Sequence, residues 1–505
     1  MPEVWIDLMF GWMLGFIRQG VVLLYFLAAG TLMLYGLNCY IMIGLFRRRR
    51  REALWKSRVV LEKAGDLSNR RDLPVVTTQI PVYNELNVVE RVLTAASRMR
   101  YPPGLHEIQV LDDSTDETRE RVKTLADALR MQGHEIRVLR RKNRTGYKAG
   151  ALAHGLKSAR GELVAVFDAD FVPPEDYLLC TVPFFLADNR VGLVQARWGH
   201  LNRRRSLLTR AQSIGIDGHF MVEQAARNWN GLYMNFNGTA GIWRRCAIEA
   251  GGGWQWDTLT EDMDLSYRVQ FAGWRAVYLP EVVVPAEIPE DVEAFKSQQF
   301  RWAKGSIQTA LKLLPLLLRQ PVPVFQKIQA VFHMTHYLVH PLMLTLSVLA
   351  LPVLMILEIG WAPFLFGIIA GALALSMAAP SALYLVSQRA AYSDWPRRMT
   401  ALPLLVMVGV GLAVSNSRAV FEALIGRESG FVRTPKRGDR EIKAYRIHLP
   451  WTSVVEIGVG VYCLFSLHIY LGAAKYLIGP FLAIYAAGFL FVGFLTLAQN
   501  LNFQR

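Results

Sequence analysis

The sequence predicts a cytosolic α/β domain inserted between transmembrane α-helices. The chain of 505 residues is 52% hydrophobic and only 19% charged, and its apolar residues concentrate towards the two ends. Its middle part alternates β-branched apolar runs with helical stretches, a pattern typical of a sheet with crossover helices. We therefore expect an N-terminal membrane anchor at residues 1–50, a cytosolic domain at 51–330 and a channel-like transmembrane region at 331–505.

The first membrane span is expected at residues 20–46, which are apolar, uncharged and long enough to cross a bilayer. Five arginines follow at residues 47–51 and place the C-terminal end of this span in the cytoplasm. The net charge of +15 lies largely in such runs beside apolar segments. The charge is therefore assigned to membrane orientation, and we expect a lipid bilayer and no nucleic acid as a partner.

The middle part is expected to form a parallel sheet, in which ligands bind beyond the carboxyl ends of the strands. We predict strands at 75–80, 108–111, 136–139, 163–167 and 191–196, and helices near 85–99, 116–132 and 147–159.

Four further spans are predicted by length after residue 330, at 333–359, 362–387, 453–474 and 476–498. The stretch 400–424 is interrupted by polar residues at 415–418. Since both loops that flank this stretch are basic, both are expected in the cytoplasm, and a single span cannot join them. We therefore predict a re-entrant or interfacial helix pair here.

Two pairs of aspartates stand directly after predicted strands. Asp168 and Asp170 form an Asp-x-Asp pattern that can hold Mg²⁺ or Mn²⁺, although the same pattern occurs as ordinary turn chemistry. Asp112 and Asp113 could contact a nucleobase, a ribose or the metal. The alternative for this second pair is an N-cap of the helix expected near Thr115.

Two later motifs carry candidate catalytic groups. Asp262 could act as the base that a transfer of sugar to a hydroxyl requires, or it could simply favour a helix N-terminus. Gln298, Arg301 and Trp302 share one helix face by their spacing. Arginine binds diphosphate bidentately and tryptophan stacks on sugars, but alone the motif could be an amphipathic anchor.

A glycine-bearing loop at residues 143–150 opens a predicted helix and carries Arg144 and Lys148, which suit a phosphate. It lacks the Gly-Lys-Ser/Thr order of a Walker A loop. His333, His336 and His340 follow a helical spacing without an HExxH arrangement, which favours packing and hydrogen bonding over metal binding.

Taken in order, these motifs resemble the processive family-2 inverting glycosyltransferases, which include cellulose synthase, hyaluronan synthase and the cellulose-synthase-like mannan and glucomannan synthases. The resemblance is dense over residues 75–305. The segments that carry it are 81–85, 110–116, 146–150, 167–171, 193–198, 236–243, 260–262 and 298–302.

The resemblance implies a GT-A (Rossmann-like) fold and a UDP- or GDP-sugar donor. It implies Asp262 as catalytic base, and Asp168 and Asp170 as ligands of Mg²⁺ or Mn²⁺. The residues implied to bind the nucleotide sugar are Tyr83, Glu85, Asp112, Asp113, Lys148, Gln298 and Arg301. Those implied to bind the acceptor are Trp302, Glu261, Gly238 and Thr239, and those of a gating loop near 427–450 are Phe431, Thr434 and Lys436.

We therefore expect a multi-pass enzyme of the inner (plasma) membrane with a cytoplasmic catalytic domain. It would add β-linked hexosyl units from UDP-glucose, or alternatively GDP-mannose, to a growing polysaccharide and translocate it. An accessory export subunit is a further expected partner. The alternative is a single-addition enzyme that makes a glycolipid from diacylglycerol or ceramide.

Overall fold

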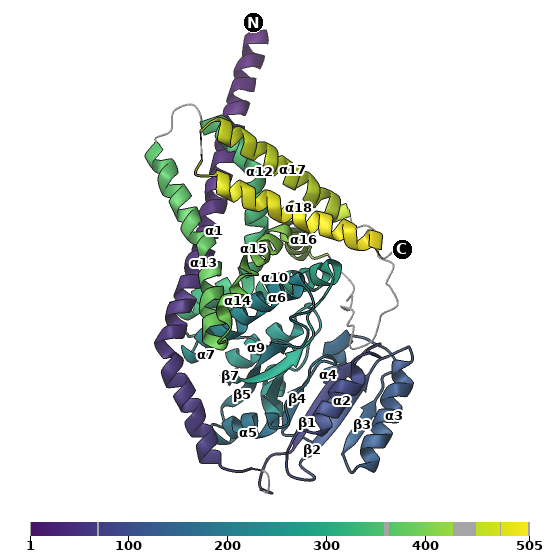
Figure 1. Ribbon diagram of the computed structural model, residues 1–505. Helices are drawn as coiled ribbons and strands as arrows, with labels where there is room; N and C mark the ends of the chain where they lie inside the picture. Colours follow the sequence, from purple (N-terminus) through teal and green to yellow (C-terminus); the bar gives the residue numbers. More distant parts are fainter. Residues whose placement is uncertain (1, 68–69, 358–362, 428–450, 475, 503–505) are drawn as a thin grey trace.

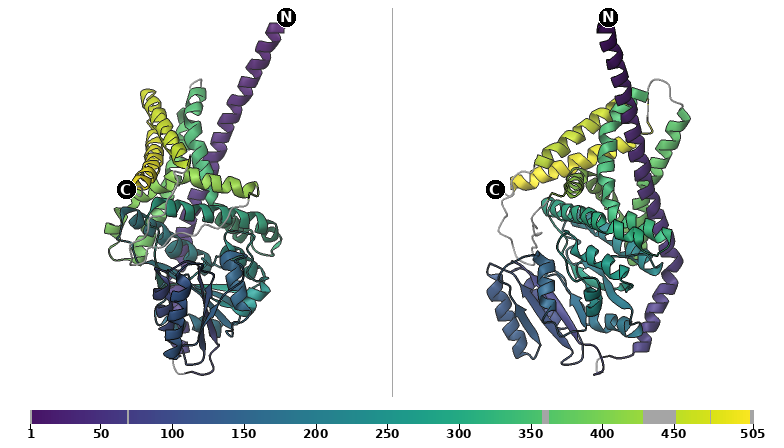
Figure 2. Two further views of the ribbon diagram at one scale, coloured as in Figure 1. Left: turned by 90° about the vertical axis from the view of Figure 1, so that its right-hand side faces the viewer. Right: turned by 180° about the vertical axis from the view of Figure 1, so that it is seen from behind.

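The computed structural model describes residues 2–67, 70–357, 363–427, 451–474 and 476–502 (Figure 1). A sheet-containing part occupies one end of the molecule and long helices occupy the other (Figures 1 and 2). Helix α1 (Pro2–Ala64) runs beside both parts. At 1.5 Å per residue its 63 residues extend about 95 Å, so the segment after the five arginines continues as helix along the sheet domain.

The described residues form one seven-stranded sheet in the order β3-β2-β1-β4-β6-β5-β7. Its strands are β1 (Val76–Val82), β2 (His106–Asp112), β3 (Ile136–Leu139), β4 (Leu163–Val166), β5 (Val191–His200), β6 (Gly241–Arg244) and β7 (Arg275–Ala286). The five predicted strands are present, but the all-parallel sheet is wrong. β6 pairs antiparallel with both β4 and β5, so it runs in the direction opposite to both neighbours.

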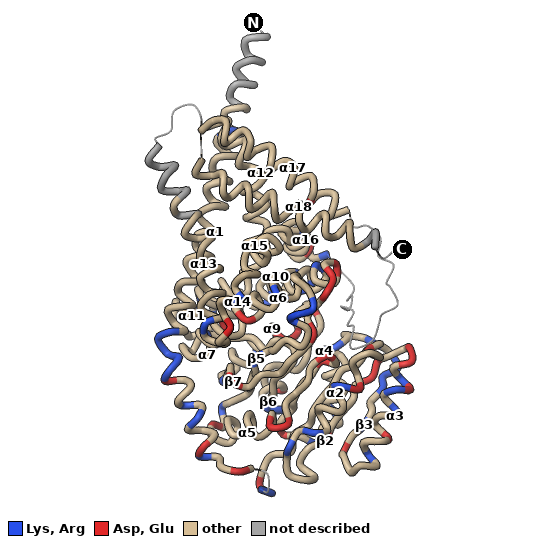
Figure 3. Tube along the Cα trace, in the orientation of Figure 1, with Lys and Arg blue, Asp and Glu red and all other residues tan. Residues whose placement is uncertain are grey.

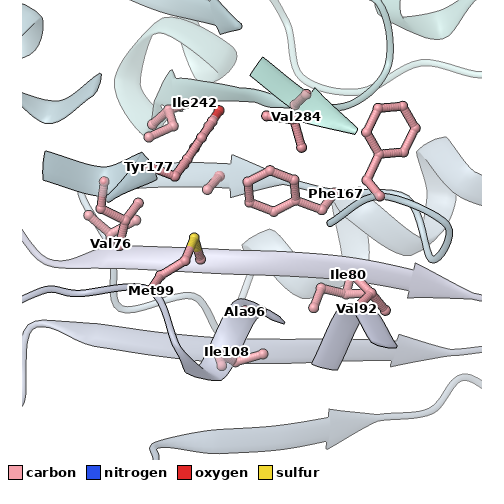
Figure 4. Packing of buried hydrophobic residues seen from close by; sticks show 14 of the residues in the cluster. Val76, Ile80, Val92, Ala96, Met99, Ile108, Phe167, Tyr177, Ile242 and Val284 are labelled. Atoms are coloured by element: carbon pink, nitrogen blue, oxygen red, sulfur yellow. The ribbon is translucent and has the colours of Figure 1, made fainter. Parts of the chain in front are cut away.

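Helices cover both faces of this sheet, and its strands are buried accordingly. The helices of this domain are α2 (Val89–Ser97), α3 (Thr118–Met131), α4 (Tyr147–Leu156), α5 (Tyr177–Ala187), α6 (Leu207–Gly218), η1 (His219–Gln224), α7 (Ala225–Trp229), α8 (Arg245–Ala250) and α9 (Glu261–Phe271). Helix α10 (Val292–Arg319) lies between this domain and the apolar helices (Figure 1). Figure 4 shows the main core, in which Val76, Ile80 and Phe167 are fully buried beside Tyr177. Such burial on both faces fits the apolar run of β4, whereas β1 and β2 also bury polar side chains such as Gln79 and Gln109.

The remaining helices form the second part of the molecule. They are α11 (Val324–Thr335), η2 (His336–Leu338), α12 (Val339–Leu357), α13 (Pro363–Ala391), α14 (Trp395–Met399), α15 (Leu402–Gly411), α16 (Ala413–Leu424), α17 (Trp451–Gly472) and α18 (Gly479–Asn502). Within the described residues, four helical segments are long and apolar enough to cross a membrane: Met13–Ala64, Val324–Ile356, Trp451–Gly472 and Gly479–Gln499. Charged residues gather in the sheet domain and along the lower half of α1, whereas α12, α17 and α18 are mostly uncharged (Figure 3).

The ambiguous stretch 400–424 is a bent pair of helices. The segment 395–411 and α16 meet at an angle of 42°, a geometry of either a broken span or a re-entrant loop. The predicted division into two helices is therefore observed.

Helix α10 joins the two parts of the molecule through buried ion pairs. Lys296 lies 2.8 Å from Glu456 on α17, and Lys304 lies 3.0 Å from Glu422 on α16. Both lysines are almost fully buried. Because buried charges are tolerated only when they are paired, these contacts fix the position of α10 against the apolar helices.

Candidate active site

A cavity of about 220 Å³ opens at the carboxyl ends of β1, β2 and β4 and reaches across to β5 and β7. Helix α10 borders the cavity on one side. Its wall includes most of the predicted site residues: Tyr83, Glu85, Asp113, Lys148, Asp168, Asp170, Gly238, Glu261, Asp262, Gln298, Arg301 and Trp302. Segments that are far apart in the sequence thus meet at one edge of the sheet, as the strand-end rule predicts.

The β1–β2 side of the cavity carries an aromatic ring and a carboxylate that are each held by an arginine. The guanidinium carbon of Arg144 lies 3.3 Å from the ring centroid of Tyr83. Arg141 donates from Nε to Asp113 at 3.0 Å and makes a second bond to the same carboxylate from Nη2. A stacked guanidinium and a fixed carboxylate offer a flat surface and an acceptor to a nucleobase or ribose.

The two aspartates after β2 have different surroundings. Asp113 lines the cavity, whereas the side chain of Asp112 is fully buried behind the wall. Asp112 accepts from Arg140 Nε at 2.9 Å and from the backbone N–H of Ser114 at 3.0 Å. Helix α3 begins only at Thr118, so Asp112 is not its N-cap. Asp113 is therefore the residue of this pair that a ligand in the cavity can contact, whereas Asp112 stabilises the loop after β2.

Lys148 lines the cavity from the start of α4. Its Nζ is 2.5 Å from Asp168 and donates to the carbonyl of Gly238 at 2.8 Å. Burial lowers the pKa of Lys148, but Asp168 and Glu261 outweigh burial and raise its pKa overall. Thr239 lies behind the wall and accepts from the backbone N–H of Asp168 at 2.9 Å. The ammonium of Lys148 is thus held charged where a diphosphate could bind.

Asp262 and Glu261 form a carboxylate pair in the first turn of α9. Burial raises the pKa of Asp262 to about 7, with Glu261 as the second cause, while Lys148 opposes the shift. Burial also raises the pKa of Glu261. A Cβ on Gly238 would lie 2.9 Å from Asp262 Oδ2, and the φ of Gly238 is +80°. Only glycine therefore fits beside this carboxylate without strain.

Gln298, Arg301 and Trp302 project from α10, which is tied to the loop before Asp262. The backbone N–H of Leu259 donates to Gln308 at 3.0 Å. A Cβ on Gly305 would lie 2.6 Å from a side-chain atom of Thr260, so a glycine allows this close approach. Burial lowers the pKa of Arg301 to about 10, with Glu261 and Asp168 opposing. Asp262 and Arg301 are therefore positioned on two elements that are packed together.

The structure also shows cavity residues that were not predicted as site residues. Among them are Trp198, Gly199 and His200 at the end of β5, Tyr147 on α4, and Glu287 after β7. Arg144 was noted from its loop, and Trp198 ends the segment 193–198, one of those that carry the family resemblance. The predicted gating-loop residues Phe431, Thr434 and Lys436 lie outside the described residues.

The three histidines at 333, 336 and 340 have packing roles, as expected. His333 shares a hydrogen bond of 2.7 Å with the Tyr267 hydroxyl, and His340 one of 2.9 Å with Asn416. No cluster of three or more His, Cys, Asp or Glu side chains suited to a metal occurs in the parts of the chain that the structure describes. A metal site here would have two carboxylates, Asp168 and Asp170, and further ligands from substrate.

Comparisons with known proteins identify the same segment. Residues 74–305 match the family model for glycosyltransferase like family 2. Probable glucomannan 4-beta-mannosyltransferase 10 of Arabidopsis thaliana is 42% identical over 264 residues, which cover 51% of this chain and 48% of that protein. Glucomannan 4-beta-mannosyltransferase 1 of Oryza sativa subsp. japonica is 40% identical over 265 residues, covering 52% of this chain and 51% of that protein.

The chain thus spans about half the length of these two relatives. Among solved structures, the mannosyltransferase PcManGT of Pyrobaculum calidifontis, in complex with GDP-Man and Mn²⁺, is 21% identical with a TM-score of 0.46. That similarity covers 79% of this chain and all of the PcManGT chain.

Proposed function

Because residues 74–305 of this chain belong to the family 2 glycosyltransferases, we propose that the protein transfers hexosyl units from a nucleotide sugar to a growing β-linked glycan. The mixed α/β sheet of this segment is a GT-A fold, and apolar helices flank it. One observation carries the proposal. The cavity brings together a carboxylate with a pKa of about 7, two cations and a tryptophan.

In the proposed reaction Asp262 takes the proton of an acceptor hydroxyl as that oxygen attacks the anomeric carbon of the donor. A pKa near 7 suits this role, since the group is then both available and basic at neutral pH. The bond from the anomeric carbon to the diphosphate breaks, and the diphosphate leaves with its electron pair. Arg301 and Lys148 are placed to stabilise its charge.

A divalent cation, Mg²⁺ or Mn²⁺, fits the carboxylate donor set of Asp168 and Asp170. Both residues line the cavity, and the Asp168 side chain is 34% exposed. Such cations commonly bind one or two carboxylates together with substrate phosphates. When bound, the cation would neutralise charge on the diphosphate.

On the nucleotide side, we assign Tyr83, Asp113 and Arg144 to the base or ribose. On α10, we assign Trp302 to the acceptor sugar. The names of the curated relatives favour a mannosyl donor over the UDP-glucose expected from the wider family. A donor panel of UDP-glucose and GDP-mannose with purified protein distinguishes the two.

We further propose a multi-pass protein of the inner (plasma) membrane with its catalytic domain in the cytoplasm. The arginines after the first apolar segment and the mostly uncharged long helices support this orientation. Translocation of the glycan through these helices, with an accessory export subunit as partner, is part of the same proposal.

Labelled donor incubated with membranes tests the acceptor class. Polymer synthesis predicts a high-mass, alkali-stable glycan. A lipid-extractable product would instead support the alternative, a single transfer to diacylglycerol or ceramide. Absence of label in both fractions, with every donor tested, would contradict the proposal.

A further inference from the structure

We propose that Trp198 and His200, at the end of β5, form a second sugar-binding wall of the cavity that takes a neutral hexopyranosyl unit of the acceptor glycan. This inference rests on the proposed transferase function. It adds a binding site to the residues already assigned to the acceptor. Its basis is a pair of buried polar atoms, one donor and one acceptor, that lack partners in the described structure.

The order of the strands divides the cavity into two halves. β1 and β2 supply Tyr83 and Asp113, β4 leads to Asp168 near the middle, and β5 and β7 form the far half. A nucleoside diphosphate that spans the first half and reaches Asp168 leaves the β5–β7 half for the other substrate. Trp302 lies on this same half, since its ring centroid is 6.5 Å from that of Trp198.

Trp198 and His200 are two residues apart on one strand, so their side chains point to the same face of the sheet. Both line the cavity. The indole Nε1 of Trp198 and the Nδ1 of His200 are buried and have no hydrogen-bond partner among the described residues. A buried polar atom without a partner is costly, and a bound ligand that supplies the hydrogen bond removes this cost.

The hydrogen bond of the other ring nitrogen, Nε2, determines whether Nδ1 of His200 donates or accepts. His200 Nε2 lies 3.0 Å from Oδ1 of the fully buried Asp217. Burial disfavours the charged form of Asp217, but His200, Gln388 and Arg197 outweigh burial and lower its pKa. Because an ionised carboxylate only accepts, Nε2 carries a proton, and Nδ1 is an acceptor whenever the imidazole is neutral.

Asp217 is itself firmly held. Gln388 donates to its Oδ2 at 2.8 Å and the Tyr392 hydroxyl donates to its Oδ1 at 3.1 Å. Gln388 lies on α13, so this carboxylate connects the cavity wall to one of the long apolar helices. His200 therefore has a fixed ring orientation, and its side chain is only 3% exposed.

This wall matches a neutral sugar better than a charged group. The indole N–H donates to a hydroxyl or ring oxygen, and His200 Nδ1 accepts from a neighbouring hydroxyl. Trp198 and Trp302 are inclined by 54° and both line the cavity, so together they form an aromatic corner suited to the C–H surface of a pyranose. A pattern of one donor, one acceptor and aromatic faces selects hydroxyl-bearing rings.

Two conservative variants of the full chain, purified in detergent, test the assignment. Trp198→Phe removes the N–H and keeps an aromatic ring. His200→Gln keeps an amide donor for Asp217 and removes the Nδ1 acceptor. Trp254→Phe is the matched control, since the Nε1 of Trp254 is also buried without a partner but Trp254 is not among the residues that line the cavity.

The measurements are the KM for added β-1,4-mannotetraose or cellotetraose, the KM for the donor, and nucleoside diphosphate release without acceptor. We expect Trp198→Phe and His200→Gln each to raise the acceptor KM roughly 3- to 10-fold, the worth of one neutral hydrogen bond. Donor KM and acceptor-free release should stay within about 2-fold, because no contact to the donor is removed. The Trp254 control should match the wild type.

An unchanged acceptor KM in both variants, or a donor KM that rises in step with it, would overturn the inference. The proposed function fails separately, if the wild type releases no nucleoside diphosphate from any nucleotide hexose. In that case, mannotetraose binding measured by saturation-transfer NMR tests the sugar-binding wall independently of catalysis. A signal that weakens in both variants supports the second sugar-binding wall, and equal signals in all proteins contradict it.

Discussion

The pH dependence of transfer tests the role of Asp262 most directly. With a pKa of about 7, and not the usual 3.8 of an aspartate, roughly half of the Asp262 carboxylates are ionised at pH 7. We therefore expect kcat/KM to fall about tenfold per pH unit below pH 7, because the base must be ionised. An aspartate with an ordinary pKa would instead give a flat profile from pH 5 upwards.

Two substitutions sharpen this expectation. Asp262→Asn removes the base and should lower kcat about 10²- to 10⁴-fold, with donor binding retained. Glu261→Gln removes the neighbouring negative charge, the second cause of the raised pKa of Asp262. The acidic limb of the kcat/KM profile should then move to lower pH. It should stay above the ordinary range of an aspartate, because burial, the larger cause of the raised pKa of Asp262, remains.

The assay follows nucleoside diphosphate release and glycan formation together between pH 5 and 8.5. Asp257→Asn is a matched control, since this carboxylate is 57% exposed and is not among the residues that line the cavity. Full activity of Asp262→Asn, or a flat wild-type profile across pH 7, would refute the assignment of the base. An unmoved limb in Glu261→Gln would refute the electrostatic coupling of the pair.

Three further outcomes are expected. Gly238→Ala should reduce the transfer rate at least about tenfold, because the alanine Cβ would displace the Asp262 carboxylate and position 238 has a left-handed φ. A fully active variant would contradict this expectation. Lys296→Met should lower the free energy of unfolding, followed by thermal unfolding, by about 3 kcal/mol, because Glu456 stays buried without its ion-pair partner. Adding Glu456→Met to this variant should restore most of the lost stability. Transfer should stop in EDTA, return with Mg²⁺ or Mn²⁺ and be weakened in Asp168→Asn, whereas unchanged turnover in EDTA would exclude the metal role.

Much of the sheet and of the site could be predicted because the signals are local. Strand β4 is a short apolar run, β1 and β2 mix aliphatic with buried polar residues, and the aspartates stand at or just after the ends of β2 and β4. β6 was missed as a strand because its four residues lie within a glycine-rich motif and pair with partners about 50 to 80 residues away. Its antiparallel direction could be read only from those partners.

The sequence by itself determined the order of the motifs, the apolar segments and the types of chemistry, because residue type, spacing and hydropathy are properties of short segments. Only the tertiary structure decided that Asp113 lines the cavity while Asp112 lies behind it, and that Trp198 and His200 join Trp302. The reason is physical. Burial, pKa shifts and hydrogen-bond partners depend on groups that are distant in the chain, such as Asp217 and Gln388, which are 171 residues apart.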